Sequence, residues 1–295
     1  MTVQLRLRDA LAILAISALG ACAATPASIT HSVGRAAAPR GIMFVDGPMV
    51  ETSHGWVTYR DVRAYRDGRL MATYFHRVLP ARDRAAASLL YDESARTARS
   101  IRGGPMRPFD PCPGTGGAGN YVELSPSGRR GLCAGEFTSA AQAHQLILFD
   151  PRSPRASRRV IFSPLGVNGR AAAWLDERRI AVTEYRPGAC PRGIKGYDDP
   201  TGLVIIDLQG RVLERGPCVF SVLAGPRGLV LVQAFPKAMR FSTDGGKTWS
   251  DGRAQFADAD GNVFYQDERW DDYVLYQAGK PTGFRDVHGA TWAKP

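Results

Sequence analysis

The sequence predicts an all-β fold, a β-propeller of five or six four-stranded blades. The composition of the 295 residues, with 44% hydrophobic and 22% charged, is that of a globular protein and excludes a disordered chain, a collagen and a coiled coil. Helical periodicity is hard to find after residue 40. Short runs of β-branched, aromatic and leucine residues recur instead, separated by Gly, Pro, Asp and Asn, and this pattern is typical of strands joined by turns.

Two sequence phrases alternate along the chain and define the predicted blades. The first is an arginine, a short apolar strand, an acid and an aromatic residue; it occurs at residues 130–137 and 178–185, with weaker copies at 69–75 and 228–233. The second is an apolar strand ending in aspartate, then a turn and a returning strand, and its copies begin at residues 89, 146 and 204. Each pair predicts a meander of about 40–50 residues, which is the size of a propeller blade. Stacking such meanders around an axis buries both of their faces.

The N-terminal segment, residues 1–21, is predicted to be a signal peptide. Arg6 and Arg8 precede an apolar run from Ala10 to Ala21, which is shorter than the ~20 residues that span a bilayer. The run ends in Leu-Gly-Ala-Cys at residues 19–22 and resembles the lipobox of bacterial lipoproteins. The resemblance implies that Cys22 is lipidated and that the protein is anchored in the outer membrane or periplasm.

Simple cleavage at the Ala-Cys-Ala of residues 21–23 is the alternative, and it would give a soluble secreted protein. Residues 22–40 are then the lipidated cysteine and a flexible tether rich in Ala, Ser, Thr and Pro. Residues 41–295 form the propeller domain.

The remaining cysteines predict two disulfides, since an exported chain with an even number of cysteines usually pairs them. They are Cys112, Cys133, Cys190 and Cys218. Pairing in sequence order closes the two shortest loops and fits the repeat layout, so we favour it over the other two pairings. A four-cysteine zinc site needs closer spacing than any found here.

Residues 242–249, Ser-Thr-Asp-Gly-Gly-Lys-Thr-Trp, resemble the Asp-box of BNR-type repeats. The residues that match the Asp-box pattern are Ser242, Asp244, Gly246, Thr248 and Trp249. The resemblance implies a β-propeller with this turn between the third and fourth strands of a blade, where the aspartate accepts backbone N–H bonds. Asp-boxes occur in sialidases, sortilin-type receptors and assembly factors, on the face away from the sialidase active site, so the box indicates fold and not function.

The predicted working surface is the end of the propeller that carries the links between blades and between second and third strands. Two long loops, residues 103–119 and 186–202, belong to this end, and long loops on a rigid scaffold are common binding sites. The candidate rim residues are Asp110, Glu136, Glu184, Arg192, Tyr197, Asp198 and Asp199.

Each candidate also has a plainer interpretation. Glu136 and Glu184 stand at equivalent strand ends and could act as a paired acid and base, but exposed or arginine-paired carboxylates are the interpretation we favour. Asp198 and Asp199 could ligate calcium, although a turn fits their spacing better. The histidines show no metal-ligand spacing and no nucleophile, phosphate-loop or zinc-protease motif occurs. The sequence therefore predicts no catalytic residue, no metal and no cofactor.

The chain carries 38 basic and 28 acidic residues, a formal charge of +10. Four arginines crowd one predicted hairpin at residues 152–159, where they could meet anionic lipid headgroups, lipopolysaccharide or an acidic partner. The interpretation we favour is a solvated turn, because the charge is otherwise dispersed along the sequence. Nucleic acid is not an expected partner, since no matching motif is present.

Three functions fit these observations. The favoured one is a non-enzymatic lipoprotein of the bacterial envelope that binds an envelope protein or polymer through its loop rim. A narrower version is an immunity-type lipoprotein that neutralises a toxin in the periplasm, since some such families carry a late Asp-Gly-Gly turn similar to residues 243–249. The enzyme alternative is a sialidase-like glycoside hydrolase, which lacks support because the Phe/Tyr-Arg-Ile-Pro phrase is absent.

Overall fold

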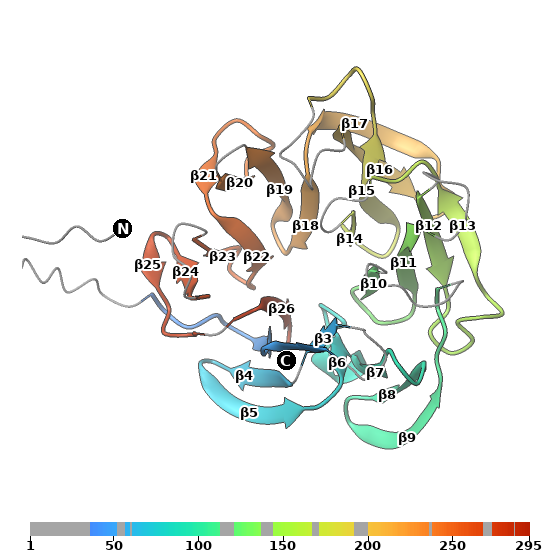
Figure 1. Ribbon diagram of the computed structural model, residues 1–295, viewed down its shortest axis with the longest axis vertical. Coiled ribbons are helices and arrows are strands. Elements are labelled where there is room, and N and C mark those ends of the chain that lie inside the picture. The colour runs from blue at the N-terminus through green and yellow to red at the C-terminus, as the bar shows by residue number, and fades with distance from the viewer. Residues whose placement is uncertain are drawn as a thin grey trace, which may run out of the picture. The chain divides into compact units, whose positions relative to one another are not determined.

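The propeller fold is observed with six blades in the described part of the chain (Figure 1). The computed structural model describes residues 36–51, 57–59, 61–112, 121–136, 144–166, 171–191, 200–235, 238–267, 273–285 and 287–295. Their strands form six four-stranded antiparallel sheets and one two-stranded ribbon, β2 (Met49–Glu51) with β3 (Val57–Tyr59). The one helix among these residues is a short 3-10 turn, η1 (Ala85–Ala87).

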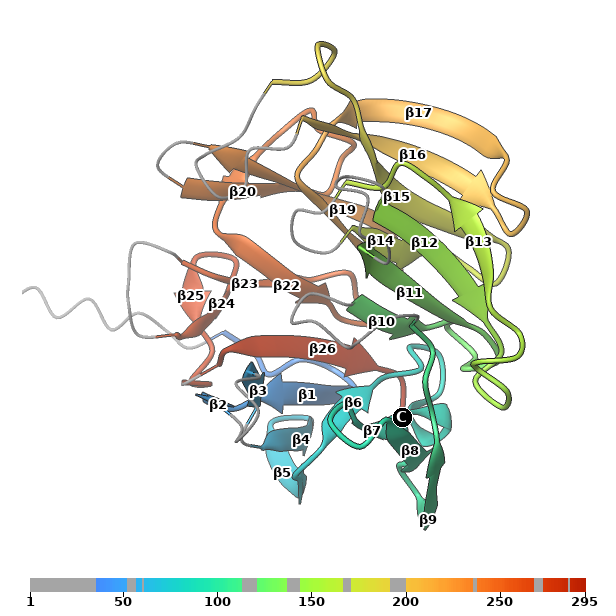
Figure 2. The ribbon, with the colours of Figure 1, turned by 45° about the vertical axis from the view of Figure 1, so that its right-hand side comes forward.

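Apart from β26, the strands of the first three blades come from residues 42–162. Blade 1 consists, from axis to rim, of β26 (Gly289–Ala293), β1 (Ile42–Asp46), β4 (Val62–Arg66) and β5 (Arg69–Tyr74). Blade 2 consists of β6 (Arg77–Leu79), β7 (Leu89–Asp92), β8 (Thr97–Ser100) and β9 (Gly103–Pro108). Blade 3 consists of β10 (Tyr121–Leu124), β11 (Gly131–Glu136), β12 (His144–Phe149) and β13 (Arg159–Phe162), which step outward in Figure 2.

The last three blades complete the ring. Blade 4 consists of β14 (Ala172–Trp174), β15 (Arg179–Tyr185), β16 (Thr201–Asp207) and β17 (Val212–Cys218). Blade 5 consists of β18 (Ser221–Gly225), β19 (Gly228–Phe235), β20 (Ala238–Ser242) and β21 (Ser250–Asp251). Blade 6 consists of β22 (Arg253–Ala257), β23 (Val263–Gln266), β24 (Leu275–Gln277) and β25 (Lys280–Pro281).

The ring is closed by pairing the last strand of the chain with the first. β26 pairs antiparallel with β1 from Ile42 opposite Ala293 to Asp46 opposite Gly289. The indole N–H of Trp292 donates to the carbonyl of Arg40 at 2.6 Å and fixes this register. Blade 1 is therefore assembled from both ends of the domain, which removes the open edges that a linear row of blades would leave.

The core lies between blades because the middle strands are apolar on both faces. In β15 and β16 most positions are buried, whereas β17, at the rim of the same blade, is mostly exposed. Between blades 3 and 4, Leu132, Leu146, Trp174 and Ile180 belong to one buried cluster. Burial on both faces of the inner strands is what stacked blades require.

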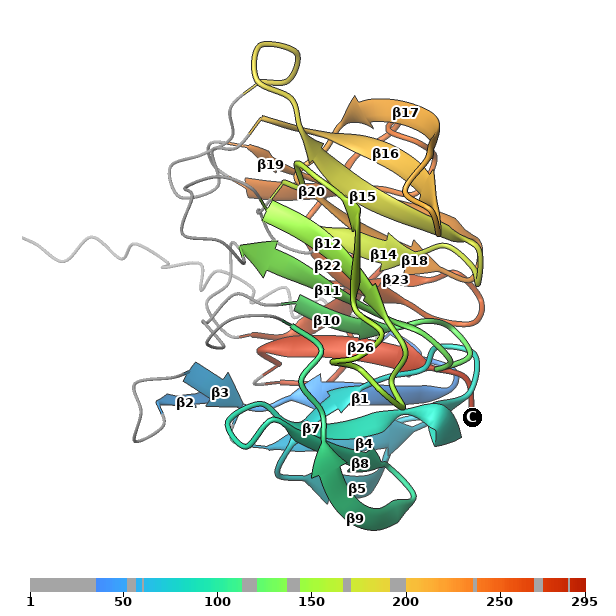
Figure 3. The same cartoon turned by 90° about the vertical axis from the view of Figure 1, so that its right-hand side faces the viewer.

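The two ends of the propeller differ in the connections that they carry. One end, here called the hairpin face, holds the turns that join first to second and third to fourth strands. The other end, the loop face, holds the links between second and third strands and between blades. Figure 3 views the blades from the side, with the end of β26 at the hairpin face on the right.

Two details of the sequence prediction are wrong. The sequence predicts that residues 103–108 begin a long loop, but they form β9, the outer strand of blade 2, which pairs with β8. The weak phrase copy at residues 69–75 predicts a second strand, but it forms β5, a fourth strand. The second error has a physical reason, because β26 from the C-terminus supplies the first strand of blade 1 and makes β5 its fourth.

The contact between blades 3 and 4 gives a stability prediction. Gly210 has a φ of +79°, and a Cβ there would overlap the carbonyl oxygen of Ile161 in β13. Gly279 has a φ of +78° but nothing lies within 4 Å of the same position. We expect Gly279→Ala to cost ~1 kcal/mol from backbone strain and Gly210→Ala ~3 kcal/mol or more, because strain and overlap add.

Urea unfolding of both variants measures the difference. Equal losses for Gly210→Ala and Gly279→Ala would show that the two blades are not packed as described.

Candidate functional site

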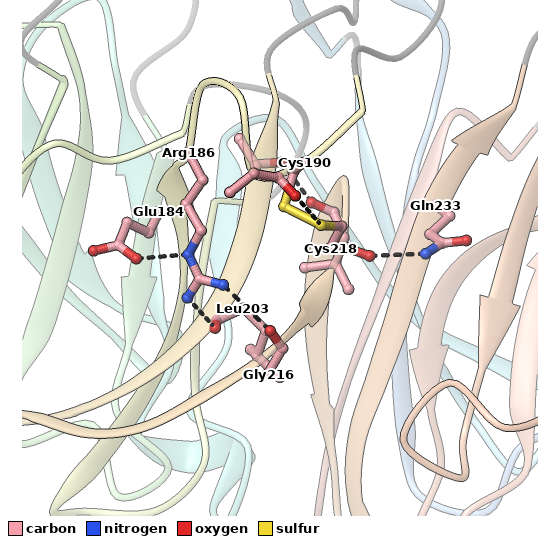
Figure 4. The surroundings of a disulfide bond; sticks show 10 residues. Glu184, Arg186, Cys190, Leu203, Gly216, Cys218 and Gln233 are labelled. Atoms are coloured by element: carbon pink, nitrogen blue, oxygen red, sulfur yellow. Dashed lines mark hydrogen bonds and ion pairs between the residues drawn. A yellow bond between two sulfur atoms is a disulfide. The ribbon is translucent and has the colours of Figure 1, made fainter.

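The link between β15 and β16 of blade 4 belongs to the loop face, and Arg186 organises the base of this link (Figure 4). The Arg186 guanidinium donates to a carboxylate oxygen of Glu184 at 2.7 Å, to the carbonyl of Leu203 at 2.9 Å and to that of Gly216 at 3.3 Å. These contacts join β15, β16 and β17. The backbone N–H of Arg186 donates to the carbonyl of Pro200 at 2.6 Å and closes the loop at its neck.

A disulfide fastens the same loop to the outer strand of its blade. Cys190 is bonded to Cys218 at the end of β17, and Gln233 of blade 5 donates to the Cys218 carbonyl at 2.7 Å. The second disulfide joins Cys112 to Cys133 in β11. Both disulfides have the sequential pairing that the cysteine spacing predicts. The base of the blade 4 loop is thus tied to its own blade and to the next.

The Glu184 carboxylate is held in hydrogen bonds with arginines and is not available as a free acid or base. Burial alone would raise its pKa, but hydrogen bonds and charges from Arg186 and Arg215 outweigh burial and hold the pKa of Glu184 below its ordinary value. Its side chain is 16% exposed. The side chain of Glu136 lies outside the described part, so the structure does not bring the two carboxylates together. The arginine-paired interpretation fits Glu184.

Asp110 lies between blades and does not stand free on a rim. Its carboxylate pairs with Arg158 of blade 3 at 3.1 Å and with Arg96 of blade 2 at 3.6 Å. The preceding Phe109 packs edge-to-face against Tyr91 and Phe149 of the same two blades. Asp110 therefore joins blades, and its part in binding stays a prediction.

Four predicted rim residues, Arg192, Tyr197, Asp198 and Asp199, lie outside the described residues, as does Cys22. The described residues on both sides of this gap, Pro191 and Pro200, belong to the loop that Arg186 and Cys190 fasten. The position of this loop on the loop face agrees with the sequence prediction, because it joins the second and third strands of blade 4.

A central cavity of about 270 Å³ runs along the axis and is lined by residues of the first strand of all six blades. Polar side chains gather around its end at the loop face: Asp46, Arg77, Tyr121, Arg253 and His288. A cavity with an apolar wall and a few convergent polar groups is the usual form of a ligand site, and this volume is near the lower end of the usual range.

Arg82 lines the cavity in the part nearer the hairpin face. It lies in the link after β6 in blade 2 and donates to the carbonyls of Trp174 at 3.1 Å and Leu175 at 3.0 Å in blade 4. Because blade 3 lies between these two blades, the arginine joins blades that are not neighbours in the ring.

Two lining groups have unused hydrogen-bonding capacity. The indole nitrogen of Trp174 and Nδ1 of His288 are buried without a hydrogen-bond partner among the described residues. Unsatisfied buried polar atoms are rare and indicate water or a ligand. The arrangement can bind a small polar group or a polar side chain of a partner.

Sequence reasoning missed this cavity because its lining comes from six strands that are far apart in the chain. The one available signal was the polar residue at the start of the first strands, as at Arg77, Tyr121 and Arg253. That signal becomes readable only once the strand order within each blade is known.

The turn at residues 242–249 joins β20 and β21, the third and fourth strands of blade 5, at the hairpin face. One carboxylate oxygen of Asp244 accepts the backbone N–H groups of Lys247 at 3.0 Å and Thr248 at 2.9 Å, and the other accepts the Thr248 hydroxyl at 2.6 Å. These bonds from Thr248, with the Ser242 hydroxyl, hold the pKa of Asp244 far below its ordinary value. The Trp249 indole N–H donates to the Gly246 carbonyl at 3.1 Å. The turn is self-contained and lies opposite the cavity mouth.

Metal-binding clusters and membrane-spanning helices are both absent from the described residues. No group of three or more His, Cys, Asp or Glu side chains is placed to hold a metal ion in the described ranges. Among the same residues, no helix has the length and hydropathy needed to cross a membrane.

Comparison with known proteins identifies similar folds at low sequence identity. No protein-family model and no curated protein matches the sequence. A solved structure of a putative TolB from Agrobacterium tumefaciens is similar over 86% of this chain and 90% of that one, with 12% identity and a TM-score of 0.46. A structure described as a eukaryotic initiation factor is similar over 84% of this chain and 68% of that one, with 11% identity and a TM-score of 0.35. Neither likeness indicates a function.

The Cys190–Cys218 bond gives a prediction for the fastened loop. The bond spans 28 residues, for which the chain-entropy model gives ~3–4 kcal/mol of stabilisation. We expect Cys190→Ser with Cys218→Ser to lower the free energy of unfolding by about that amount and to increase proteolysis within residues 186–200.

Limited proteolysis with mass spectrometry measures the local effect, and Cys112→Ser with Cys133→Ser is the matched control. Cleavage of the 186–200 loop that is no faster than in this control would contradict the assigned role.

Glu184 gives a pH prediction. Because its folded pKa is depressed, its stabilisation is present above its ordinary pKa of 4.5 and is lost as the pH falls toward the lower folded value. We expect Glu184→Gln to cost ~1–2 kcal/mol at pH 7 and much less at pH 3. Urea unfolding at both pH values measures this. Glu214→Gln, at an exposed position of β17, should have little effect at either pH, and an equal loss at pH 7 and pH 3 would refute the ionic role.

Proposed function

We propose that this protein is an exported, non-enzymatic binding propeller of the bacterial envelope, anchored through a lipid on Cys22, that holds a protein or polymer at its loop face. The carrying observation is the base of the loop between β15 and β16, which is fastened by the Arg186 hydrogen bonds and by the Cys190–Cys218 bond. Fixing the ends of a binding loop reduces the entropy that is lost on binding, which favours affinity.

Export is supported by the cysteines and by the N-terminal pattern. Disulfides persist in oxidising compartments and are rare in the reducing cytosol, and this chain has two of them in its described residues. The basic and apolar N-terminus followed by Leu-Gly-Ala-Cys fits a lipoprotein signal peptide. The turn at residues 242–249, with its aspartate hydrogen bonds, supports relation to Asp-box repeats of the BNR type.

A binding role is favoured over hydrolysis by the state of Glu184. A glycosidase needs two carboxylates about 5–9 Å apart, of which one titrates near neutral pH. The Glu184 carboxylate instead accepts hydrogen bonds from Arg186 and Arg215, which keep it ionised. The polar groups at the cavity mouth, Asp46, Arg77 and Arg253, have both signs of charge and suit a polar side chain or a sugar hydroxyl.

The binding proposal is tested by crosslinking in envelope extract. The full chain with Tyr197→Ala, Asp198→Ala and Asp199→Ala is compared with the wild type and with a matched variant, Thr243→Ala with Lys247→Ala, on the hairpin face. We expect one partner, protein or glycan, to be captured stoichiometrically by the wild type and by the hairpin-face variant. Capture by the loop variant should fall at least ~10-fold, since a few central residues dominate binding energy.

The outcomes separate the candidate functions. A captured toxin would identify the immunity-type version of this role. Equal capture by the loop variant, or no captured protein or glycan, would refute binding through this loop. Hydrolysis of a fluorogenic glycoside that Glu184→Gln abolishes would replace the binding role with an enzymatic one.

A further inference from the structure

The hairpin face has a strongly basic surface that the sequence does not reveal, because its arginines come from turns of several blades. Exposed arginines lie in first-to-second or third-to-fourth strand turns of blades 2 to 5, among them Arg84, Arg102, Arg129, Arg155, Arg178 and Arg227. None of these six forms an ion pair with a carboxylate of the described residues. Arginines that are dispersed along the sequence thus lie on one face of the propeller, because each blade places its turns there.

The carboxylates of the same face are used inside the turns. Asp176 accepts the backbone N–H groups of Arg178 and Arg179, Asp207 accepts those of Gln209 and Arg211, and Asp258 accepts those of Asp260 and Asn262. Asp244 does the same in its own turn. These hydrogen bonds lower the pKa of Asp176, Asp207 and Asp244, so the carboxylates keep their negative charge. Basic residues nevertheless outnumber acidic ones by twelve to six in the turns of blades 2 to 5, with Asp207 at the end of β16 included. The surface that these turns present is therefore cationic.

The chain enters the propeller along this same face. The backbone N–H of Ala36 donates to the carbonyl of Pro281 in β25 at 3.1 Å. Arg40 then pairs with Asp260 in the β22–β23 turn at 3.5 Å, and its carbonyl accepts from Trp292. Residues 36–41 thus run inward from the rim of blade 6 to the start of β1, at the hairpin face. The described chain therefore begins on the hairpin face.

We propose that the hairpin face is a docking surface for an anionic lipid bilayer, which it meets through arginines opposite phosphate headgroups. The proposal rests on the proposed lipid anchor. The described chain begins on this face, at residue 36. Basic residues near an anionic surface each add affinity, and the effect acts within a Debye length of about 8 Å at physiological salt. The loop face then points away from the bilayer, toward a partner.

Vesicle binding by a chain that cannot be acylated tests the surface alone. The full chain with Cys22→Ser is sedimented with vesicles of phosphatidylglycerol and phosphatidylethanolamine, and with vesicles of phosphatidylcholine alone. The test variant adds Arg129→Glu, Arg178→Glu and Arg227→Glu. The matched control adds Arg107→Glu, Arg240→Glu and Arg285→Glu, which are exposed and lie outside the hairpin-face turns and the central cavity, so both variants change the net charge equally.

We expect the Cys22→Ser chain to bind the anionic vesicles, to bind phosphatidylcholine weakly, and to lose affinity as salt is raised. The hairpin-face variant should bind about 100-fold more weakly, at ~5-fold for each arginine, and the control should lose less than ~5-fold. Circular dichroism and thermal unfolding show whether each variant is folded.

Equal losses in the two variants, or equal binding to both vesicle types, would overturn the proposal and indicate only a general effect of net charge. No binding to anionic vesicles would also overturn it, and would leave an acidic protein as the occupant of the face. Failure of vesicle binding is distinct from failure of the proposed binding function. The first is tested with substitutions in the hairpin-face turns, and the second with substitutions at residues 197–199.

Discussion

The pairing of β26 with β1 is the constraint on which the rest of the propeller depends. Five consecutive residue pairs, from Ile42 with Ala293 to Asp46 with Gly289, join the two ends of the domain. Without this pairing blade 1 would lack its innermost strand, and the ring of first strands around the axis would be open. The central cavity, the bridge from Arg82 to blade 4, and the separation of two faces all require a closed ring. Closure also explains why Trp292 is nearly fully buried, since it packs where the two chain ends meet.

Once the ring is closed, short local rules repeat six times and give the molecule two different ends. A third-to-fourth strand turn must reverse the chain in a few residues, and aspartates at its start satisfy the backbone N–H groups, as at Asp207 and Asp244. A link between second and third strands has no such limit and can be long. Hydrogen-bonded turns therefore collect on one face, and variable loops with their disulfide collect on the other. The hairpin face and the loop face differ because successive strands of a blade run in opposite directions, so alternate connections fall on opposite faces.

Much of this fold is readable from the sequence because alternating strand phrases and turn residues are local signals. Such signals predict the blade pattern, the two disulfides and the turn at residues 242–249. They give the wrong place for residues 69–75 within blade 1, because residues 289–293, far along the chain, supply the first strand of that blade. They do not predict the central cavity or the Arg186 network, because each combines residues whose proximity depends on strand register. The role of Asp110 is hidden for the same reason: its partners Arg96 and Arg158 come from two different blades.

The distribution of charge follows from the same geometry and links the two proposed surfaces. The sequence shows 33 arginines and five lysines, and a linear count cannot tell which of them share a face. In the folded chain, basic residues outnumber acidic ones in the turns of blades 2 to 5, so the hairpin face is basic although acids are frequent there. The described chain enters along this face at residues 36–41. In the two proposals taken together, the basic face meets an anionic bilayer and the loop face is left free for a partner, so the two surfaces do not compete.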